Sequence, residues 1–139
     1  MAKVRRGHRL ARRRLTLDGY VAADHLLVSP HGSRTGVVDT LLERLGRTRR
    51  VALVLQHFLV APHVVASTDL VMTVGERVAR AFARMLPLVV REPPLEVPPL
   101  AVAQIWHERQ ARDPAMVWLR SQLTAAATAT APARAGRAR

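Results

Sequence analysis

The chain is 139 residues long, the length of a single domain, and 49% of its residues are hydrophobic. That apolar share excludes an intrinsically disordered chain, because enough surface can be buried to offset the entropy of ordering. The absence of cysteine excludes a disulfide scaffold, a thiolate metal site and a cysteine nucleophile, and it fits a reducing cytoplasm. The formal net charge of +12 points first to nucleic acid or an anionic membrane surface as a partner.

The charge is concentrated at the two ends of the chain. Residues 1–14 contain seven basic side chains and residues 124–139 contain three, with no acidic side chain in either segment. Residues 15–123 hold 12 basic and 10 acidic side chains, so the body of the domain is almost balanced and we expect no nucleic-acid-binding face there. We interpret the Arg-rich start as a segment of the fold, and predict that the Ala/Thr/Arg-rich end at 124–139 is disordered.

Short apolar runs alternate with helical patterns along the chain. We expect strands at 25–29, 49–55, 70–74, 85–90 and 100–106, and helices at 18–23, 37–45, 76–83 and 115–123, with a further helix that follows Phe58 and ends near Ala66. Gly46 is expected to stop one helix and Asp113 to cap another, and 91–99 is a proline-rich connector. This alternation predicts an α/β fold with a mainly parallel sheet flanked by helices.

Two loops of this predicted sheet hold candidate binding residues. Ligands of open parallel sheets bind beyond the carboxyl ends of the strands. Ser29 and Pro30 follow one strand there, and Gln56, His57 and Phe58 follow the next. An amide and an imidazole beside an aromatic ring could bind a small organic ligand. Equally, Phe58 could belong to the core while Gln56 and His57 cap the next helix, and the residues alone leave both interpretations open.

Catalytic and metal-binding motifs are absent from the sequence. None of the six histidines belongs to an HExxH motif or to an i,i+4 pair, and no serine lies in a GxSxG motif. The segment 31–36 lacks both glycine-rich phosphate-binding patterns. Polar residues interrupt the most apolar stretch, 51–74, which therefore does not suit a membrane span. The sequence thus predicts no enzyme, no metal, no cofactor and no contact with a membrane.

Several short strings stand in an order that is typical of one family. They are RGHRLA at 6–11, LTLD at 15–18, HLLVSP at 25–30, RVAL at 50–53, HFLVAP at 57–62, TDL at 68–70, WH at 106–107, DP at 113–114 and WLR at 118–120. This ordered set resembles the effector-binding domain of LysR-type transcriptional regulators, near the nodulation and nitroaromatic-responsive branch. The chain departs from the family pattern at Arg9 and Gly75, where proline is common.

The resemblance implies a periplasmic-binding-protein-like (type 2) fold, in which two subdomains close on an effector. It assigns residues 1–99 to the second subdomain and 100–123 to the return strand and helix of the first. It also implies that the rest of the first subdomain and the helix-turn-helix DNA-binding domain are missing, so the fold is incomplete. A gene remnant or a misplaced start would produce such a chain.

On this basis we expect a truncated cytoplasmic regulator, not an enzyme, that senses a small organic effector, aromatic compounds included. The resemblance favours Gln56, His57 and Phe58 as effector contacts, followed by Ser29 and Pro30. DNA would be contacted only through the missing domain, and apolar area left on Trp106 and on 115–123 predicts self-association. The alternative hypothesis is a small basic nucleic-acid-binding protein that uses an Arg-rich N-terminal arm. A hydrolase that uses His57 is the third.

Overall fold

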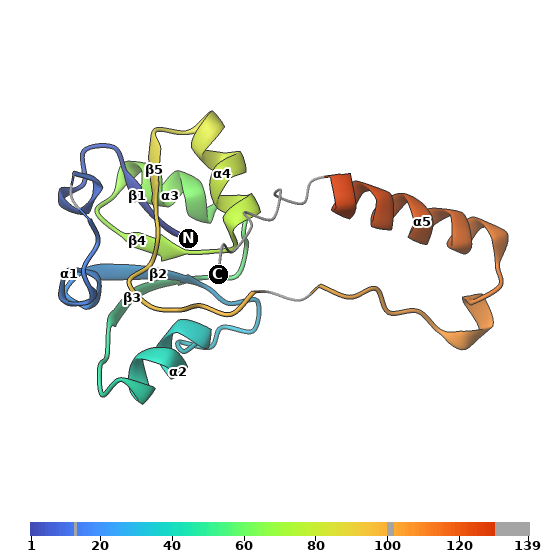
Figure 1. Ribbon diagram of the computed structural model, residues 1–139, viewed down its shortest axis with the longest axis horizontal. Helices are drawn as coiled ribbons and strands as arrows, with labels where there is room; N and C mark the ends of the chain where they lie inside the picture. Colours follow the sequence, from blue (N-terminus) through green and yellow to red (C-terminus); the bar gives the residue numbers. More distant parts are fainter. Residues whose placement is uncertain (13, 100–101, 130–139) are drawn as a thin grey trace, which may run out of the picture. The chain divides into compact units, whose positions relative to one another are not determined.

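The computed structural model describes residues 1–12, 14–99 and 102–129, and its chain forms two compact units, Met1–Pro99 and Leu100–Arg139 (Figure 1). The first unit is built on a five-stranded sheet with the order β3-β2-β4-β1-β5. The strands are β1 (Ala2–Arg5), β2 (Asp24–Val28), β3 (Arg50–Leu55), β4 (Val71–Thr73) and β5 (Leu88–Arg91). The helices are α1 (Leu17–Val21), α2 (Val37–Arg44), α3 (Ala61–Ser67) and α4 (Glu76–Met85), with a 3₁₀ helix, η1, at Arg9–Ala11.

The predicted α/β fold is confirmed, and the sheet is mixed. Strand β2 pairs in parallel with β3 and β4, as the alternation of strands and helices predicts. Strand β1 pairs antiparallel with β4 and β5, so the prediction of a mainly parallel sheet holds only for the β3-β2-β4 half. The sequence pattern does not predict β1, because its four residues include two basic side chains and the strand is defined by its pairing with β4 and β5.

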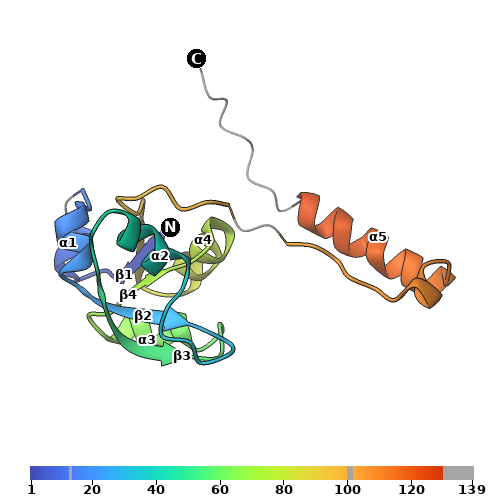
Figure 2. The ribbon, with the colours of Figure 1, turned by 90° about the horizontal axis from the view of Figure 1, so that it is seen from below.

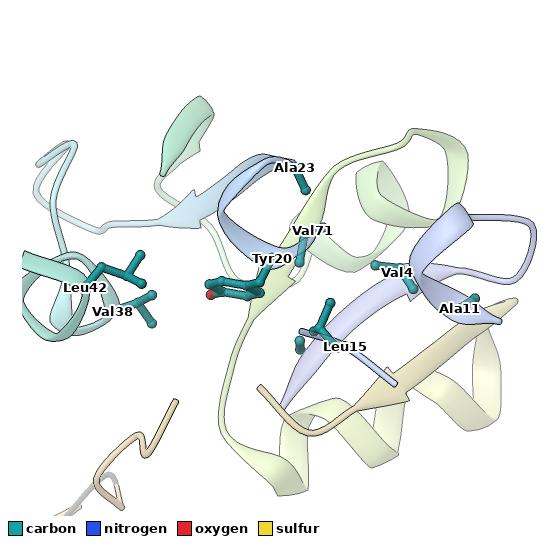
Figure 3. Close-up of a cluster of buried hydrophobic side chains, with 9 residues drawn as sticks. Val4, Ala11, Leu15, Tyr20, Ala23, Val38, Leu42 and Val71 are labelled. Carbon is teal, nitrogen blue, oxygen red and sulfur yellow. The ribbon is translucent and has the colours of Figure 1, made fainter. Parts of the chain in front are cut away.

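The two faces of the sheet bury separate hydrophobic clusters, because successive side chains of a strand point to opposite faces. In β4, Val71 belongs to the cluster with Tyr20 of α1 and Leu42 of α2, and the adjacent Met72 belongs to the cluster with Val65 of α3. Figure 2 shows α2 and α3 on opposite sides of β2. In Figure 3 the Tyr20 ring lies between the α2 side chains and those of Leu15 and Val71.

The ends of the helices agree with the capping signals in the sequence. The backbone N–H of Gly36 donates to Asp39 Oδ2 at 2.7 Å at the start of α2, and Gly46 takes a φ of +63° just after its end. Pro62 lies in the first turn of α3, where its missing N–H costs no helical hydrogen bond. The strand predicted at 85–90 begins later, at Leu88, because α4 continues to Met85.

The second unit differs from its prediction at both ends. Residues 102–106 form no strand, and residues 100–101 of the predicted strand are outside the described range. A 3₁₀ helix, η2 (Glu108–Gln110), precedes α5 (Pro114–Ala129), which is capped by Asp113 Oδ1 accepting from Met116 N at 3.0 Å. Of the end predicted to be disordered, residues 124–129 lie in α5, where alanine favours the helix, and residues 130–139 lie outside the described range.

Among the described residues, no helix is both long and apolar enough to cross a bilayer.

Candidate functional site

The two predicted sets of binding residues meet at one edge of the sheet. Strands β2 and β3 run in parallel with Val28 opposite Leu55, so Ser29 and Gln56 leave the sheet side by side. The Ser29 N–H donates to the carbonyl of Leu55 at 2.8 Å. Farther along the first loop, a Cβ placed on Gly32 would stand 4.0 Å from Gln56 Nε2. The loop after β2 and the loop after β3 are therefore direct neighbours at the carboxyl edge.

The exposure of these side chains argues against the purely structural roles that the sequence left open. Phe58 is 49% exposed, so it is not a core residue, and Leu59 and Val60 beside it are exposed as well. Helix α3 has Val60 at its N-cap position and no side-chain cap, so neither Gln56 nor His57 caps it. Pro30, Gln56 and His57 are exposed, whereas Ser29 is buried. The edge thus presents an aromatic ring beside an amide and an imidazole.

Thr73 reaches the same edge from the other side of β2, and no sequence motif singled it out. Strand β4 is parallel to β2, with Met72 opposite Leu26, so Thr73 ends at the edge where Ser29 begins its loop. The only sequence signal was a hydroxyl near the end of a predicted strand. The strand order that places it beside β2 could not be derived from the local pattern, because β4 follows β3 in the chain but pairs with β2 and β1.

The hydroxyl of Thr73 is hydrogen-bonded to a buried tyrosine. Tyr20 Oη lies 2.7 Å from Thr73 Oγ1 and 3.3 Å from Arg49 Nη1. A guanidinium can only donate, so Tyr20 Oη accepts from Arg49, while either hydroxyl can donate the bond between Tyr20 and Thr73. Thr73 is thereby connected through Tyr20 to Arg49.

A buried ion pair joins α2 to the residue that precedes β3. Arg49 donates to both carboxylate oxygens of Asp39, at 2.7 and 2.9 Å, and the two side chains are 2% and 18% exposed. Desolvation of Asp39 opposes ionisation, but hydrogen bonds from Arg49 and from the Gly36 N–H hold the pKa of this carboxyl below its usual value. Because Asp39 binds the Gly36 N–H, the ion pair fixes the end of the loop that starts at Pro30.

His25 completes the network in its neutral form. Its Nε2 lies 2.8 Å from the backbone carbonyl of Tyr20 and so carries the proton, which leaves Nδ1 to accept from Arg49 Nη1 at 3.4 Å. Burial lowers the pKa of His25 to about 4, and the nearby Arg49 charge acts in the same direction. The ring of His25 also meets the Tyr20 ring edge-on at 4.6 Å.

Two hollows lie away from the predicted site. The larger, of about 620 Å³, is at the amino ends of β2 and β3, the opposite edge, and includes Arg5, Arg9, Arg50, Asp24 and Asp69 in its lining. A second, of about 580 Å³, lies between 14–16 and 92–96. The predicted site is therefore an open edge with protruding side chains. The described residues contain no group of three or more His, Asp or Glu that could hold a metal ion.

Within the second unit, aromatic side chains lie on the surface. Gln104 Nε2 donates to the Arg120 carbonyl at 3.2 Å and to Thr124 Oγ1 at 3.0 Å, and the Arg120 guanidinium stands 4.6 Å from the centre of the Trp106 ring. These contacts hold the extended segment against α5. Even so, Trp106 and Trp118 are 48% and 63% exposed.

Comparison with known proteins gives a consistent result. Residues 2–128 match the family model described as the LysR substrate binding domain. The HTH-type transcriptional regulator SyrM 1 of Sinorhizobium fredii is 40% identical over 128 residues, which are 91% of this chain and 38% of that protein. The HTH-type transcriptional activator NahR of Pseudomonas putida is 33% identical over 116 residues, covering 84% of this chain and 39% of that protein.

Solved structures show the same likeness. The regulatory domain of MexT, a transcriptional activator in Pseudomonas aeruginosa, superposes with a TM-score of 0.70 at 34% identity, over 89% of this chain and 60% of that chain. A probable transcriptional regulator from the same organism gives a TM-score of 0.72 at 30% identity, over 89% of this chain and 40% of that one. The chain spans less than two-fifths of the length of SyrM 1 and NahR.

Proposed function

The chain belongs to the LysR substrate-binding domain family, and on that premise we propose that it is the effector-sensing part of a transcriptional regulator that acts in the cytoplasm. The relatives named above are transcriptional regulators and not enzymes, which supports a binding role. In our proposal residues 1–99 are the second subdomain of the effector-binding domain, and 100–123 belong to the first. DNA recognition is assigned to a helix-turn-helix domain, as the names of the relatives indicate.

One observation carries the proposal: two loops from parallel neighbouring strands converge at the carboxyl edge of the sheet. Open α/β sheets bind ligands at this edge. The exposed Phe58 ring suits stacking against an aromatic effector, and Gln56 and His57 beside it suit hydrogen bonds to polar substituents. Ser29 and Pro30 border the same position from β2, and Thr73 adds a hydroxyl group from β4.

The proposed mechanism is a shift in population between open and closed forms of the complete effector-binding domain. A small organic effector that binds the closed form more tightly favours closure, and closure repositions the DNA-binding domains of an oligomer. The Asp39–Arg49 pair contributes by holding the loop after β2 in place, so that the effector meets an edge that is already formed.

A binding experiment tests the site. Ligand-observed NMR with benzoate, phenol and benzamide probes is run on the full chain and on Phe58→Ala and His57→Ala. We expect binding of at least one probe and a weakening of at least fivefold in both variants. Met85→Ala, which removes another exposed apolar side chain, is the matched control and leaves binding unchanged. Absence of binding by all three probes, or equal binding in every variant, contradicts the proposal.

We further propose that the chain associates with itself through its second unit. Trp118, Leu119 and Leu123 of α5 are 63%, 41% and 51% exposed, an apolar area that favours association. Sedimentation velocity over a range of concentrations tests this. A monodisperse monomer at every concentration contradicts it.

A further inference from the structure

The Arg-rich start of the chain presents three exposed arginine side chains on the first unit. Arg6, Arg9 and Arg12 recur at every third residue and are exposed, whereas His8 and Ala11 between them are buried. Arg9 begins the 3₁₀ helix η1 (Arg9–Ala11), Arg6 lies in the turn before it, and Arg12 follows its last residue. We call Arg6, Arg9 and Arg12 the arginine row.

The segment that bears the arginine row is anchored to the sheet and is not a free arm. The Arg6 N–H donates to the carbonyl of Pro87 at 3.0 Å. His8 lies with its Nε2 3.1 Å from the Asp69 carbonyl, and its Nδ1 accepts from the Leu10 N–H at 3.0 Å. Arg91 donates to the Ala11 carbonyl. The alternative hypothesis of an N-terminal arm is therefore wrong in its geometry: the positive charge is held on a folded surface.

No acidic group neutralises the arginine row among the described residues. Residues 1–12 contain no Asp or Glu. The two acidic groups in the hollow beside Arg9 are already engaged, since Asp69 pairs with Arg5 at 2.8 Å and Asp24 pairs with Arg50 at 3.2 Å. These two ion pairs border the same hollow as Arg9. Three guanidinium groups thus point to solvent without a partner in the part of the chain that the structure describes.

We propose that the arginine row binds the phosphodiester backbone of double-stranded nucleic acid without reading its sequence. The planar guanidinium fork matches phosphate oxygens in a bidentate arrangement. Each arginine carries its own long side chain, so neighbouring arginines can reach separate phosphates of a duplex that presents one charge per about 1.7 Å of axis. This surface is distinct from the proposed effector site, because its neighbouring hollow lies at the amino ends of β2 and β3.

Other anionic partners fit the arginine row less well. Single-stranded nucleic acid is bound through aromatic platforms, and no aromatic residue occurs in residues 1–14. Binding to an anionic membrane surface requires apolar side chains that insert beside the charges, whereas Ala11 is buried and Leu10 packs against the core. An acidic protein surface is distinguished by experiment.

The test is fluorescence anisotropy of a 20-base-pair duplex of arbitrary sequence with the full chain, from 25 to 200 mM KCl. The row variant is Arg6→Gln/Arg9→Gln/Arg12→Gln. The control variant is Arg44→Gln/Arg84→Gln/Arg109→Gln, which removes the same charge from exposed positions elsewhere. For the row variant we expect the slope of log K against log salt to become less steep by about 2.7, because each phosphate that is no longer bound reduces the slope by about 0.9. The control variant keeps the slope of the unmodified chain.

Each outcome decides the proposal. Equal reductions of the slope in both variants mean that net charge alone drives binding, and they overturn it. So does an absence of duplex binding at 25 mM KCl. Tighter binding to polyglutamate, or to vesicles with 30% anionic lipid, than to the duplex also overturns it. Circular dichroism melts of both variants confirm that the fold is retained, because all six side chains are exposed.

Discussion

On the face of the sheet covered by α1 and α2, buried polar groups are connected to one another. Arg49 contacts Asp39, Tyr20 and His25, and each of these has a further partner. On the face covered by α3 and α4, the buried cluster is apolar, and Lys3 is fully buried beside it. Among the described residues, Lys3 Nζ contacts the Val78 carbonyl at 3.3 Å and the Phe82 ring at 5.0 Å, with no carboxylate partner.

The two faces of the sheet are therefore stabilised in different ways. The network face connects α1, β2, α2, β3 and β4 through directional bonds, so it fixes where the loop after β2 and the Thr73 hydroxyl stand. The apolar face is held by packing that has no preferred direction. We therefore expect changes on the network face to alter both stability and the predicted site. Changes on the apolar face should alter stability alone.

The largest effect is expected from breaking the buried ion pair. Arg49→Met leaves the Asp39 carboxylate largely buried without its counter-charge, and removal of one partner of such a pair costs about 3–5 kcal/mol of unfolding free energy. Urea unfolding followed by circular dichroism measures the loss. A cost below about 1 kcal/mol would mean that solvent already screens this pair.

The double variant Asp39→Asn/Arg49→Met sharpens the result. It removes both charges, and the amide oxygen that replaces the carboxylate can still accept the Gly36 N–H, so its cost should be clearly smaller than that of Arg49→Met alone. An equal or greater cost would show that the pair acts mainly through packing.

The local pattern of the sequence was sufficient to predict most helices and strands. It also predicted the edge of the sheet at which the candidate residues lie. Apolar runs marked β2, β3 and β4 to within about a residue, and Gly46 and Asp113 marked helix ends. It failed where a strand depends on its partner. Strand β1 is defined by its pairing with β4 and β5, whereas residues 102–106 have an apolar strand-like pattern and are not in a strand.

The polar network could not be predicted for the same reason. Asp39 and Arg49 are ten residues apart, and Tyr20 and Thr73 are separated by 53, so no periodicity connects them. Their meeting depends on the strand order and on the packing of α2 over the sheet. The effector contacts at Gln56, His57, Phe58, Ser29 and Pro30 remain predictions. What the structure adds is that both loops lie at one edge.

The second-largest expected effect is a loss of stability on acidification. It should begin at a pH above the range in which carboxylates titrate. The pKa of His25 is about 4 in the fold and near 6.5 when unfolded, so between these values the unfolded chain binds a proton that the folded chain does not. Stability should therefore fall from pH 6.5 to 4, by about 3 kcal/mol from this group. His8, whose pKa is also lowered by burial, adds in the same direction.

Unfolding free energies at pH 7, 5.5 and 4.5 check this expectation. His25→Gln keeps a donor for the Tyr20 carbonyl but does not titrate, so its stability should change much less over this range. A flat profile for the unmodified chain would mean that His25 is solvated in the folded state.

The smallest expected change in unfolding free energy is on the apolar face, and it is a gain of stability instead of a loss. Lys3→Met keeps the length of the side chain and its contact with Phe82 while it removes a buried charge that lacks a carboxylate partner, so at pH 7 we expect a gain of about 1–2 kcal/mol.

The pH dependence of this gain separates charge from packing. Burial lowers the pKa of Lys3 to about 8, below the 10.5 of an exposed lysine, so between these values the folded chain releases a proton that the unfolded chain retains. The unmodified chain should therefore gain stability from pH 8 toward pH 10, and its difference from Lys3→Met should narrow. Because Lys3 is the only lysine of the chain, no other lysine side chain contributes to this change. If the difference in unfolding free energy between Lys3→Met and the unmodified chain stays constant with pH, the gain comes from packing and not from removal of the charge. The two faces of the sheet would then differ in how their buried polar groups are connected, but not in the free energy that a buried charge costs.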